Sequence, residues 1–229
     1  MKKKQLVILS GAGISVESGI NTFRDADGLW EGHDIYEVAS PIGFKKNPEL
    51  VLDFYNQRRK QLFEVSPNKG HENLVKLEDK FDVHIVTQNV DDLHERAGSS
   101  NVIHLHGELR KVRSTIDKNL VYNWDKDIVL GDLCEKKSQL RPHIVWFGED
   151  VPLLEKVLEI TMKADILVII GTSMQVYPAA SLIEYVDIST PIYFIDPKPA
   201  ITENVYDNLT IIKDVASSGT DQLIKMLTK

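Results

Sequence analysis

The sequence predicts an α/β fold in which helices flank a parallel sheet and two insertions form a small second domain. Short apolar runs rich in Val, Ile and Leu alternate with stretches of helical length, which is the order of a parallel α/β sheet. Four of these runs are almost continuously apolar, as expected for strands covered on both faces. The first run leads directly into a glycine-rich turn, which is typical of the first strand-to-helix connection in such sheets.

The expected strands cover residues 5–9, 83–86, 166–170, 192–195 and 209–212. The expected helices cover residues 48–63, 71–78, 153–163, 179–185 and 219–227. The first of these helices has a clear beginning, because Asn47 can cap it and proline is favoured at its first position, residue 48. Two polar stretches interrupt the alternation of strands and helices. We interpret both as insertions into a single α/β unit that covers residues 1–229. We divide it into a Rossmann-like core at about 1–24, 64–109 and 142–229, and a small domain from insertions 25–63 and 110–141.

The bulk composition excludes several classes of protein. The net charge of −7 argues against a nucleic-acid-binding surface, which requires clustered Lys and Arg. Cys134 is the only cysteine, so no disulfide can form within the chain. The apolar run after the basic residues 2–4 is too short for a signal peptide, and no run approaches the roughly 20 residues of a membrane helix. We therefore expect a cytoplasmic protein that binds neither nucleic acid nor membrane.

The turn after the first expected strand contains Gly11 and Gly13, which would let the backbone approach a pyrophosphate at a helix N-terminus. The third glycine is Gly19, whereas the ordinary dinucleotide fingerprint requires a glycine at position 16. Taken alone, the turn is therefore equally compatible with a tight strand-to-helix connection that binds nothing.

Further motifs follow along the chain: GINTFRD at 19–25, QNVD at 88–91, HLHG at 104–107, WFGE at 146–149 and GTS at 171–173. In this order and spacing they resemble the motifs of sirtuins, and the resemblance covers about residues 5–226. It implies an NAD-dependent protein-lysine deacylase, which consumes NAD and acyl-lysine and gives nicotinamide, free lysine and O-acyl-ADP-ribose. Because the transition state resembles an oxocarbenium ion, such a site has to exclude water and hold both reactants in line.

The resemblance assigns His106 and Asn89 to catalysis. His106 would be the general base for a ribose hydroxyl, since an imidazole titrates near neutral pH. Asn89 and Asp91 follow an expected strand, at the edge where α/β sheets bind ligands, and could match the nicotinamide carboxamide. His104 would point to the opposite side of its extended segment, so we expect it to be structural.

The expected NAD-binding residues are Gly11, Ala12, Gly13, Ser15, Thr22, Phe23, Arg24, Gln88, Asn89, Val90, Asp91, Gly171, Thr172, Ser173, Asp196, Val215 and Ala216. Phe23 would shield the reactive face of the sugar, and Arg24 would order its loop around the phosphates. Asp196 ends an expected strand, where a carboxylate could grip ribose hydroxyls and would repel a 2′-phosphate. Asn21 replaces the proline that the family usually has at this position.

The substrate lysine would enter as an added β-strand between residues 145–149 and the loop 174–177. The expected substrate-binding residues are Tyr55, Arg58, Val145, Trp146, Phe147, Gly148, Glu149 and Val176. Tyr55 and Arg58 share one helix face, and the pair resembles the class III sirtuins that remove succinyl, malonyl and glutaryl groups. A guanidinium fork and a phenol hydroxyl can hold the terminal carboxylate of such an acyl chain.

The alternative interpretation of that helix is an amphipathic segment with a surface arginine, as we expect for Arg59 and Lys60. The loop 39–41 also resembles the class III subclass, which favours the acidic-acyl interpretation. Most sirtuins also hold a structural zinc ion with four cysteines, but the corresponding interval here contains only Cys134. We therefore expect no metal, and an insertion held together by packing around Tyr122 and Trp124.

Other functions would use the same cofactor loops. A mono-ADP-ribosyltransferase or an NAD hydrolase would need no peptide-binding segments, and the chain has candidates for them. An NAD sensor without turnover would be expected to lack His106 or Asn89, and both are present. A dehydrogenase is disfavoured by the glycine spacing and by the QNVD motif.

Overall fold

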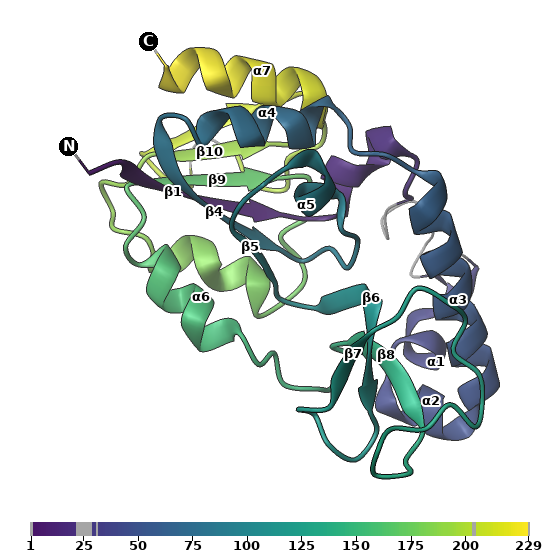
Figure 1. Cartoon of the computed structure of the whole chain (residues 1–229). Helices are drawn as coiled ribbons and strands as arrows, with labels where there is room; N and C mark the ends of the chain where they lie inside the picture. The colour runs from purple at the N-terminus through teal and green to yellow at the C-terminus, as the bar shows by residue number, and fades with distance from the viewer. Residues whose placement is uncertain (1, 22–28, 31, 203–204, 229) are drawn as a thin grey trace.

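A six-stranded parallel sheet forms the centre of the fold, in the order β11–β10–β9–β1–β4–β5 (Figure 1). The computed structural model describes residues 2–21, 29–30, 32–202 and 205–228. The sheet strands are β1 (Lys4–Ser10), β4 (Phe81–Thr87), β5 (Val102–His104), β9 (Ile166–Ile170), β10 (Ile192–Ile195) and β11 (Leu209–Ile212). All of their pairings are parallel, so the α/β fold expected from the sequence is confirmed.

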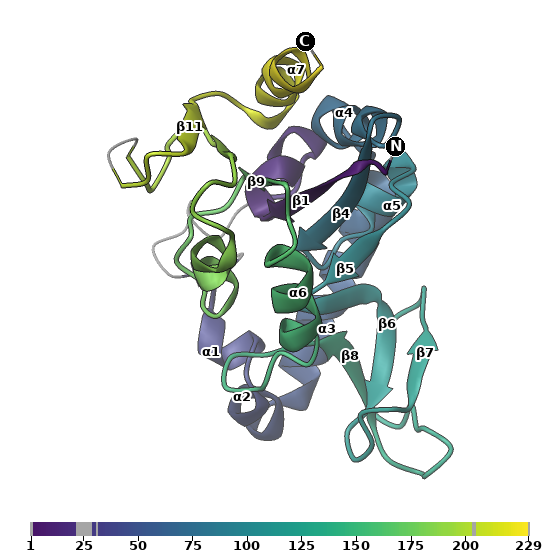
Figure 2. The same cartoon turned by 90° about the vertical axis from the view of Figure 1, so that its left-hand side faces the viewer.

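Helices cover both faces of this sheet, as Figures 1 and 2 show. One face carries α4 (Lys69–Leu77) and α7 (Ala216–Leu227), with α5 (Leu93–Ala97) beside α4. The other face carries α6 (Leu154–Thr161) and the 3₁₀ helix η3 (Ala179–Tyr185).

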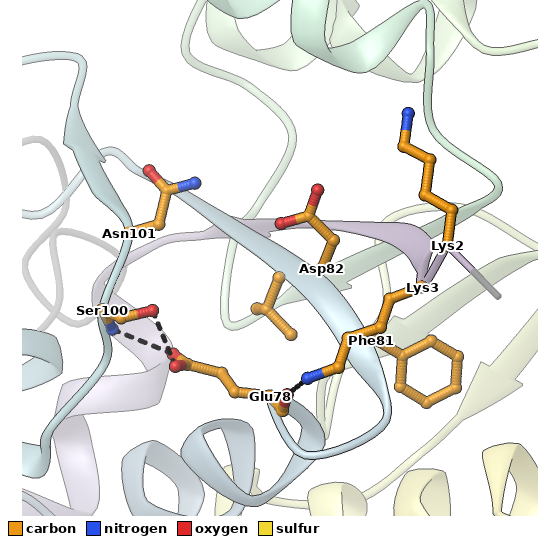
Figure 3. Close-up of a pocket in the computed structure, with 8 residues that line it drawn as sticks. Lys2, Lys3, Glu78, Phe81, Asp82, Ser100 and Asn101 are labelled. Carbon is orange, nitrogen blue, oxygen red and sulfur yellow. Dashed lines mark hydrogen bonds between the residues drawn. The ribbon is translucent and has the colours of Figure 1, made fainter.

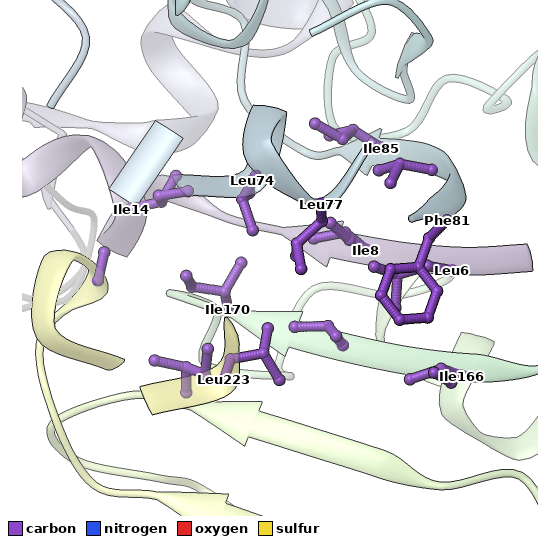
Figure 4. Close-up of a cluster of buried hydrophobic side chains, with 14 of the residues drawn as sticks. Leu6, Ile8, Ile14, Leu74, Leu77, Phe81, Ile85, Ile166, Ile170 and Leu223 are labelled. Atoms are coloured by element: carbon purple, nitrogen blue, oxygen red, sulfur yellow. The ribbon is translucent and has the colours of Figure 1, made fainter. Parts of the chain in front are cut away.

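The side chains of β1 alternate between these two layers, because successive residues of a strand point to opposite faces. Leu6 and Ile8 pack against α4 and α7 in the cluster of Figure 4, whereas Val7 and Leu9 pack against α6 and η3. A strand with an apolar layer on each side must be apolar at every position, which is why the sequence runs were continuous.

A second lobe lies beyond the carboxyl ends of these strands. Its antiparallel sheet has the order β7–β6–β8, formed by β6 (Gly107–Ser114), β7 (Val121–Asn123) and β8 (Leu140–Ile144). It packs beside α3 (Pro48–Glu64), with α1 (Ile35–Val38), α2 (Pro41–Lys46) and the short pair β2 (Leu29–Trp30) and β3 (His33–Asp34) nearby (Figure 1). Because β6 runs across residues 109 and 110, the division into core and small domain stays a proposal.

Apolar packing joins the insertion to α3. Leu52, Val112, Ile128, Cys134 and Leu140 form a buried cluster, and Tyr122 and Trp124 pack against it. Within the described residues, no helix combines the length and the apolar composition that crossing a membrane requires.

Candidate active site

The loops that leave β1, β4, β5 and β9 meet at one edge of the sheet, because the carboxyl ends of parallel strands lie together. The loop after β1 forms the 3₁₀ helix η1 (Ala12–Ser18), and its Gly13 amide donates to the Gly171 carbonyl at 2.7 Å. The side-chain amide of Gln88, in the β4 loop, donates to the Thr172 hydroxyl at 3.1 Å. Three of the sequence motifs are thus in direct contact. Thr22, Phe23 and Arg24 lie outside the described residues.

The glycines of the first loop are required by this contact. A Cβ atom on Gly11 would lie 2.8 Å from the Gly171 oxygen, and one on Gly13 would lie 2.6 Å from the Gly171 Cα. The irregular third glycine also has a structural reason: Gly19 ends η1 with a φ of +96°, which glycine adopts at little cost. Position 16 lies inside η1 and needs no glycine.

A chain of buried polar groups joins η1 to the β4 loop. The Asn89 side-chain amide donates to the Ser15 hydroxyl at 3.2 Å, and that hydroxyl donates to an Asp91 oxygen at 3.0 Å. The Leu93 amide donates to the other Asp91 oxygen at 3.1 Å. Burial raises the pKa of Asp91, which shifts this carboxyl toward its protonated form. The amide and the carboxyl are therefore held in fixed positions near the carboxyl edge.

His106 lies beside this cluster, in the connection between β5 and β6. Its Nδ1 is 3.1 Å from the Gln88 carbonyl oxygen, and since a carbonyl only accepts, Nδ1 carries the proton. Nε2 is then the basic nitrogen. Burial lowers the pKa of His106, which keeps the imidazole neutral at neutral pH. His106 can therefore accept a proton through Nε2.

His104 is held differently, with Nδ1 3.0 Å from the Asn89 carbonyl and Nε2 2.7 Å from a Glu95 oxygen. Burial opposes protonation here, but the hydrogen bond and the charge of Glu95, the Asn89 carbonyl and the charge of Glu108 together outweigh it and raise the pKa of His104. Both ring nitrogens are thus used by the fold. A further buried contact, the Ser10 hydroxyl against Nε2 of His94 at 2.9 Å, ties the end of β1 to α5.

The start of α7 reaches the same edge through a contact that the sequence did not predict. The Glu17 carboxylate of η1 accepts from the Ser217 amide at 2.9 Å and from the Ser217 hydroxyl at 2.6 Å. A carboxylate at a helix N-terminus is favourable, and this one brings Val215 and Ala216 beside the glycine loop. Asp196, at the end of β10, is buried and accepts from the Lys198 amide at 2.8 Å.

The segment 145–149 is anchored at several points. The Val145 amide donates to the His106 carbonyl at 2.9 Å, and the Phe147 amide donates to the Ala39 carbonyl at 2.9 Å. Trp146 is buried, and its indole N–H donates to the Tyr55 hydroxyl at 3.0 Å. After Gly148, which has a φ of +89°, comes Glu149, and both of its carboxylate oxygens are bound by arginines of the protein itself.

An open pocket of about 540 Å³ lies next to this segment and is lined by residues 149–152, Leu154, Glu155 and Pro178. Glu149 ends one of the two segments expected to bind a peptide, and Pro178 directly follows the other, residues 174–177. A separate pocket, of about 450 Å³, lies at the amino ends of β1, β4 and β5 (Figure 3). Glu78 there is engaged by the Ser100 amide and hydroxyl at 2.9 and 2.7 Å, far from the motif loops.

Tyr55 and Arg58, both on the helix α3, differ in burial and in their contacts. Tyr55 is fully buried, and burial raises the pKa of its hydroxyl well above the usual range, so it stays protonated. The half-buried Arg58 places its guanidinium over the Phe54 ring, 4.9 Å from the centroid. Its Nε is buried and has no hydrogen-bond partner in the described part of the chain.

The expectation of a surface Arg59 was wrong. Arg59 is 1% exposed, and its guanidinium donates to the Leu109 carbonyl at 2.8 Å and to the Asn56 side-chain oxygen at 2.9 Å. The guanidinium thus satisfies polar atoms where α3 meets the insertion. Lys60 is exposed, as expected, and pairs with Asp127 at 2.9 Å.

Cys134 is buried in the apolar cluster of the insertion, with its Sγ 3.3 Å from the Ser114 hydroxyl. Among the residues that the structure describes, no group of three or more His, Cys, Asp or Glu side chains could hold a metal ion.

Comparisons with known proteins agree with this geometry. The Sir2 family model matches residues 11–178, and the chain belongs to the Sir2 family. An NAD-dependent protein deacylase of Helicobacter pylori is 62% identical over 224 residues, covering 98% of this chain and 97% of that protein. One from Bacteroides thetaiotaomicron is 50% identical, covering 98% of each chain.

Solved structures extend the comparison to complexes. A Sir2 homologue bound to NAD has a TM-score of 0.87 at 40% identity, covering 99% of this chain and 90% of that one. A Sir2 mutant bound to a p53 peptide and NAD has a TM-score of 0.79 at 26% identity, covering 99% and 94%. The sirtuin resemblance and the Rossmann-like core are thereby confirmed.

Proposed function

We propose that this chain is an NAD-dependent protein-lysine deacylase that prefers acidic acyl groups. The observation that carries the enzyme class is the buried assembly of Ser15, Asn89 and Asp91 beside a neutral His106, at the ligand-binding edge of a parallel sheet. The similar deacylases of Helicobacter pylori and Bacteroides thetaiotaomicron, and the NAD complex of a similar Sir2 structure, support it.

The donor set at this edge suits NAD. Asn89 offers an amide, and Asp91 offers a carboxyl shifted toward its protonated form, so the pair can both donate to and accept from the nicotinamide carboxamide. The glycines of the loops at Gly11–Gly13 and Gly171–Ser173 let phosphates and ribose approach the backbone closely, and Val215 and Ala216 flank these loops. The Gly11 and Gly13 amides themselves donate to the Ile170 and Gly171 carbonyls. In the reaction, nicotinamide leaves the ribose and the acyl oxygen bonds to the vacated carbon. A ribose hydroxyl then attacks the acyl carbon, the bond from that carbon to the lysine nitrogen breaks, and one water molecule supplies the remaining oxygen, so the products are free lysine and O-acyl-ADP-ribose.

His106 acts as the base in this scheme. Its Nε2 takes a proton from a ribose hydroxyl, which becomes the nucleophile toward the acyl carbon. The hydrogen bond from Nδ1 to the Gln88 carbonyl orients the ring for this transfer. Other catalytic histidines are oriented by a second hydrogen bond in the same way.

The acyl-lysine peptide lies between residues 145–149 and the loop 174–177, with its side chain beside Trp146. The open pocket beside Glu149 and Pro178 and the p53-peptide complex of a similar Sir2 protein support this position. The backbone contacts of Val145 and Phe147 fix the start of this segment, which then turns at residues 147–148.

The acidic-acyl preference rests on Arg58. Its guanidinium has one buried Nε–H without an acceptor in the described residues, and a lost hydrogen bond to a charged donor costs about 1 to 3 kcal/mol. A ligand carboxylate would supply that acceptor. Tyr55 accepts from Trp146 and keeps its own O–H to donate, so it can contribute a second bond to the same carboxylate.

The test compares succinyl-lysine and acetyl-lysine versions of one peptide, with NAD, by nicotinamide release and peptide mass. Arg58→Met is compared with Lys60→Met, a change to an exposed cation on the same helix. We expect faster removal of succinyl by the wild type and by Lys60→Met, and loss of that preference in Arg58→Met. Equal or faster acetyl removal by the wild type would refute the preference. Nicotinamide release with both peptides intact would instead indicate an NAD hydrolase or an ADP-ribosyltransferase.

A further inference from the structure

Two buried arginines face each other in the small sheet. Arg113 of β6 is in register with Arg141 of β8, and their side chains are only 7% and 8% exposed. Like charges directly opposite each other in an antiparallel pair are destabilising, and burial makes them more so. Such a pair persists only where an anion lies between the two guanidinium groups.

Glu149 is that anion. Arg113 donates to its two oxygens at 3.0 and 2.9 Å, and Arg141 donates to the same two oxygens at 2.7 and 3.1 Å. Burial opposes ionisation of Glu149, but the hydrogen bonds from Arg141 and the Trp146 amide, together with the charges of Arg141 and Arg113, outweigh it and lower the pKa of this carboxyl. Burial lowers the pKa of Arg141 to about 10, which still leaves it charged at neutral pH. The three groups form one ionised cluster with four charge-assisted hydrogen bonds.

This cluster holds Trp146 on two sides. One Glu149 oxygen accepts from the Trp146 backbone amide at 2.9 Å. The Arg141 guanidinium lies over the Trp146 ring, 3.2 Å from its centroid, and also donates to the Ile144 carbonyl at 2.9 Å. The opposite end of the indole is fixed by Tyr55. Both the backbone and the ring plane of Trp146 therefore depend on Arg141.

We propose that Arg141 is a positioning residue for acyl-lysine binding, which sets the Trp146 wall through Glu149 and through stacking on the indole. The inference rests on the proposed function, because Trp146 is the side chain assigned there to the acyl-lysine. Arg141 belongs to the small sheet and touches neither the glycine loop nor the QNVD loop in any of its hydrogen bonds. The loss of Arg141 should therefore weaken peptide binding more than NAD binding.

The conservative variant Arg141→Lys separates charge from geometry. An ammonium keeps the charge and can pair with Glu149, but it cannot form two parallel hydrogen bonds or lie flat on an indole. Arg141→Met removes the charge as well and leaves Arg113 and Glu149 as a simple pair. Lys136→Met is the control, since it removes an exposed ion pair, that of Lys136 with Asp117, from the same insertion.

The experiment measures two dissociation constants for each variant: a fluorescein-labelled succinyl-lysine peptide by anisotropy, and NAD by calorimetry. Arg141→Met should weaken peptide binding about tenfold or more, which corresponds to about 1.4 kcal/mol, and should leave NAD binding within about twofold. Arg141→Lys should fall between Arg141→Met and the wild type. Lys136→Met should match the wild type in both. In turnover, the change should appear in the peptide KM more than in kcat.

Two outcomes would overturn the inference. One is a folded Arg141→Lys or Arg141→Met protein that binds the peptide as tightly as the wild type does. The other is an equal loss of peptide and NAD affinity, which indicates a merely structural role. If Arg141→Met fails to fold, Arg141→Lys alone decides. A wild type that binds no acyl-lysine peptide refutes the proposed function itself, and that result is visible before any variant is made.

Discussion

Gly13 and Gly171 are in backbone contact: the Gly13 amide donates to the Gly171 carbonyl at 2.7 Å, and the two Cα regions leave no room for a side chain. The contact joins the loop after β1 to the loop after β9, which are the two loops expected to surround the phosphates and the ribose of NAD. The two loops can approach this closely only because neither Gly13 nor Gly171 has a side chain.

Gly13→Ala should push the two loops apart. The new Cβ would lie 2.6 Å from the Gly171 Cα and 2.8 Å from its oxygen, and overpacking against backbone costs about 1 to 3 kcal/mol. We expect a lower midpoint of unfolding and at least tenfold weaker NAD binding, measured by calorimetry. Gly131→Ala is the control, because Gly131 has a φ of +98° but open space around it, so the variant is strained without moving a loop. Unchanged NAD affinity in Gly13→Ala would contradict the argument.

The acid limb of the activity profile should report His106. Burial lowers the pKa of His106 below its ordinary value of 6.5, so the base stays neutral and active as the pH falls through 6.5. A plot of kcat/KM against pH should therefore lose activity only below that value. His106→Ala should reduce kcat by about a hundredfold or more while leaving NAD affinity within a few fold. A limb centred above pH 6.5 would count against His106 as the base.

A buried histidine should make the fold sensitive to acid. His71 is fully buried, with its ring 5.0 Å from that of His94, and burial lowers the pKa of His71 to about 4. The unfolded chain binds this proton near pH 6.5, so stability is complete above that pH and is lost as the pH falls toward 4. His71 should contribute a loss of about 2 kcal/mol between pH 7.5 and 5.0.

His71→Gln tests this, since glutamine at this capping position can still accept from the Asn68 amide but does not titrate. The variant should lose about 2 kcal/mol less than the wild type over the same interval, measured by urea unfolding. Parallel losses in the two proteins would show that His71 does not titrate on unfolding.

The insertion should need no zinc. Cys134 packs with Val112, Ile128 and Leu140, and this cluster replaces the cross-links that a metal would supply. Elemental analysis of the purified protein should find far less than one zinc ion per chain, and EDTA should leave the midpoint of thermal unfolding unchanged. Stoichiometric zinc, with unfolding at a lower temperature in EDTA, would refute this.

The motif residues themselves could be read from the sequence, but the contacts between them could not. The five predicted strands lie where they were expected, because strands buried on both faces must be continuously apolar. The strands β5 to β8 were not predicted, because β5 and β7 have only three residues each and the sequences of β6 and β8 contain several charged side chains among their apolar ones. Arg59 was misplaced for a related reason: a charged side chain is buried only where backbone carbonyls from elsewhere receive it.

The sequence by itself determined the layered fold, because apolar periodicity is a local property. It also determined the order of the short motifs that resemble those of sirtuins, and this resemblance indicated the family. Tertiary structure alone decided which polar groups meet. Glu17 caps a helix that begins at residue 216, and Glu149 lies between Arg113 and Arg141 of the small sheet. Such contacts join chain segments that are far apart in the sequence, so they depend on how the chain folds. The residues next to a Glu in the sequence do not indicate whether its carboxylate binds solvent, a substrate or two buried arginines.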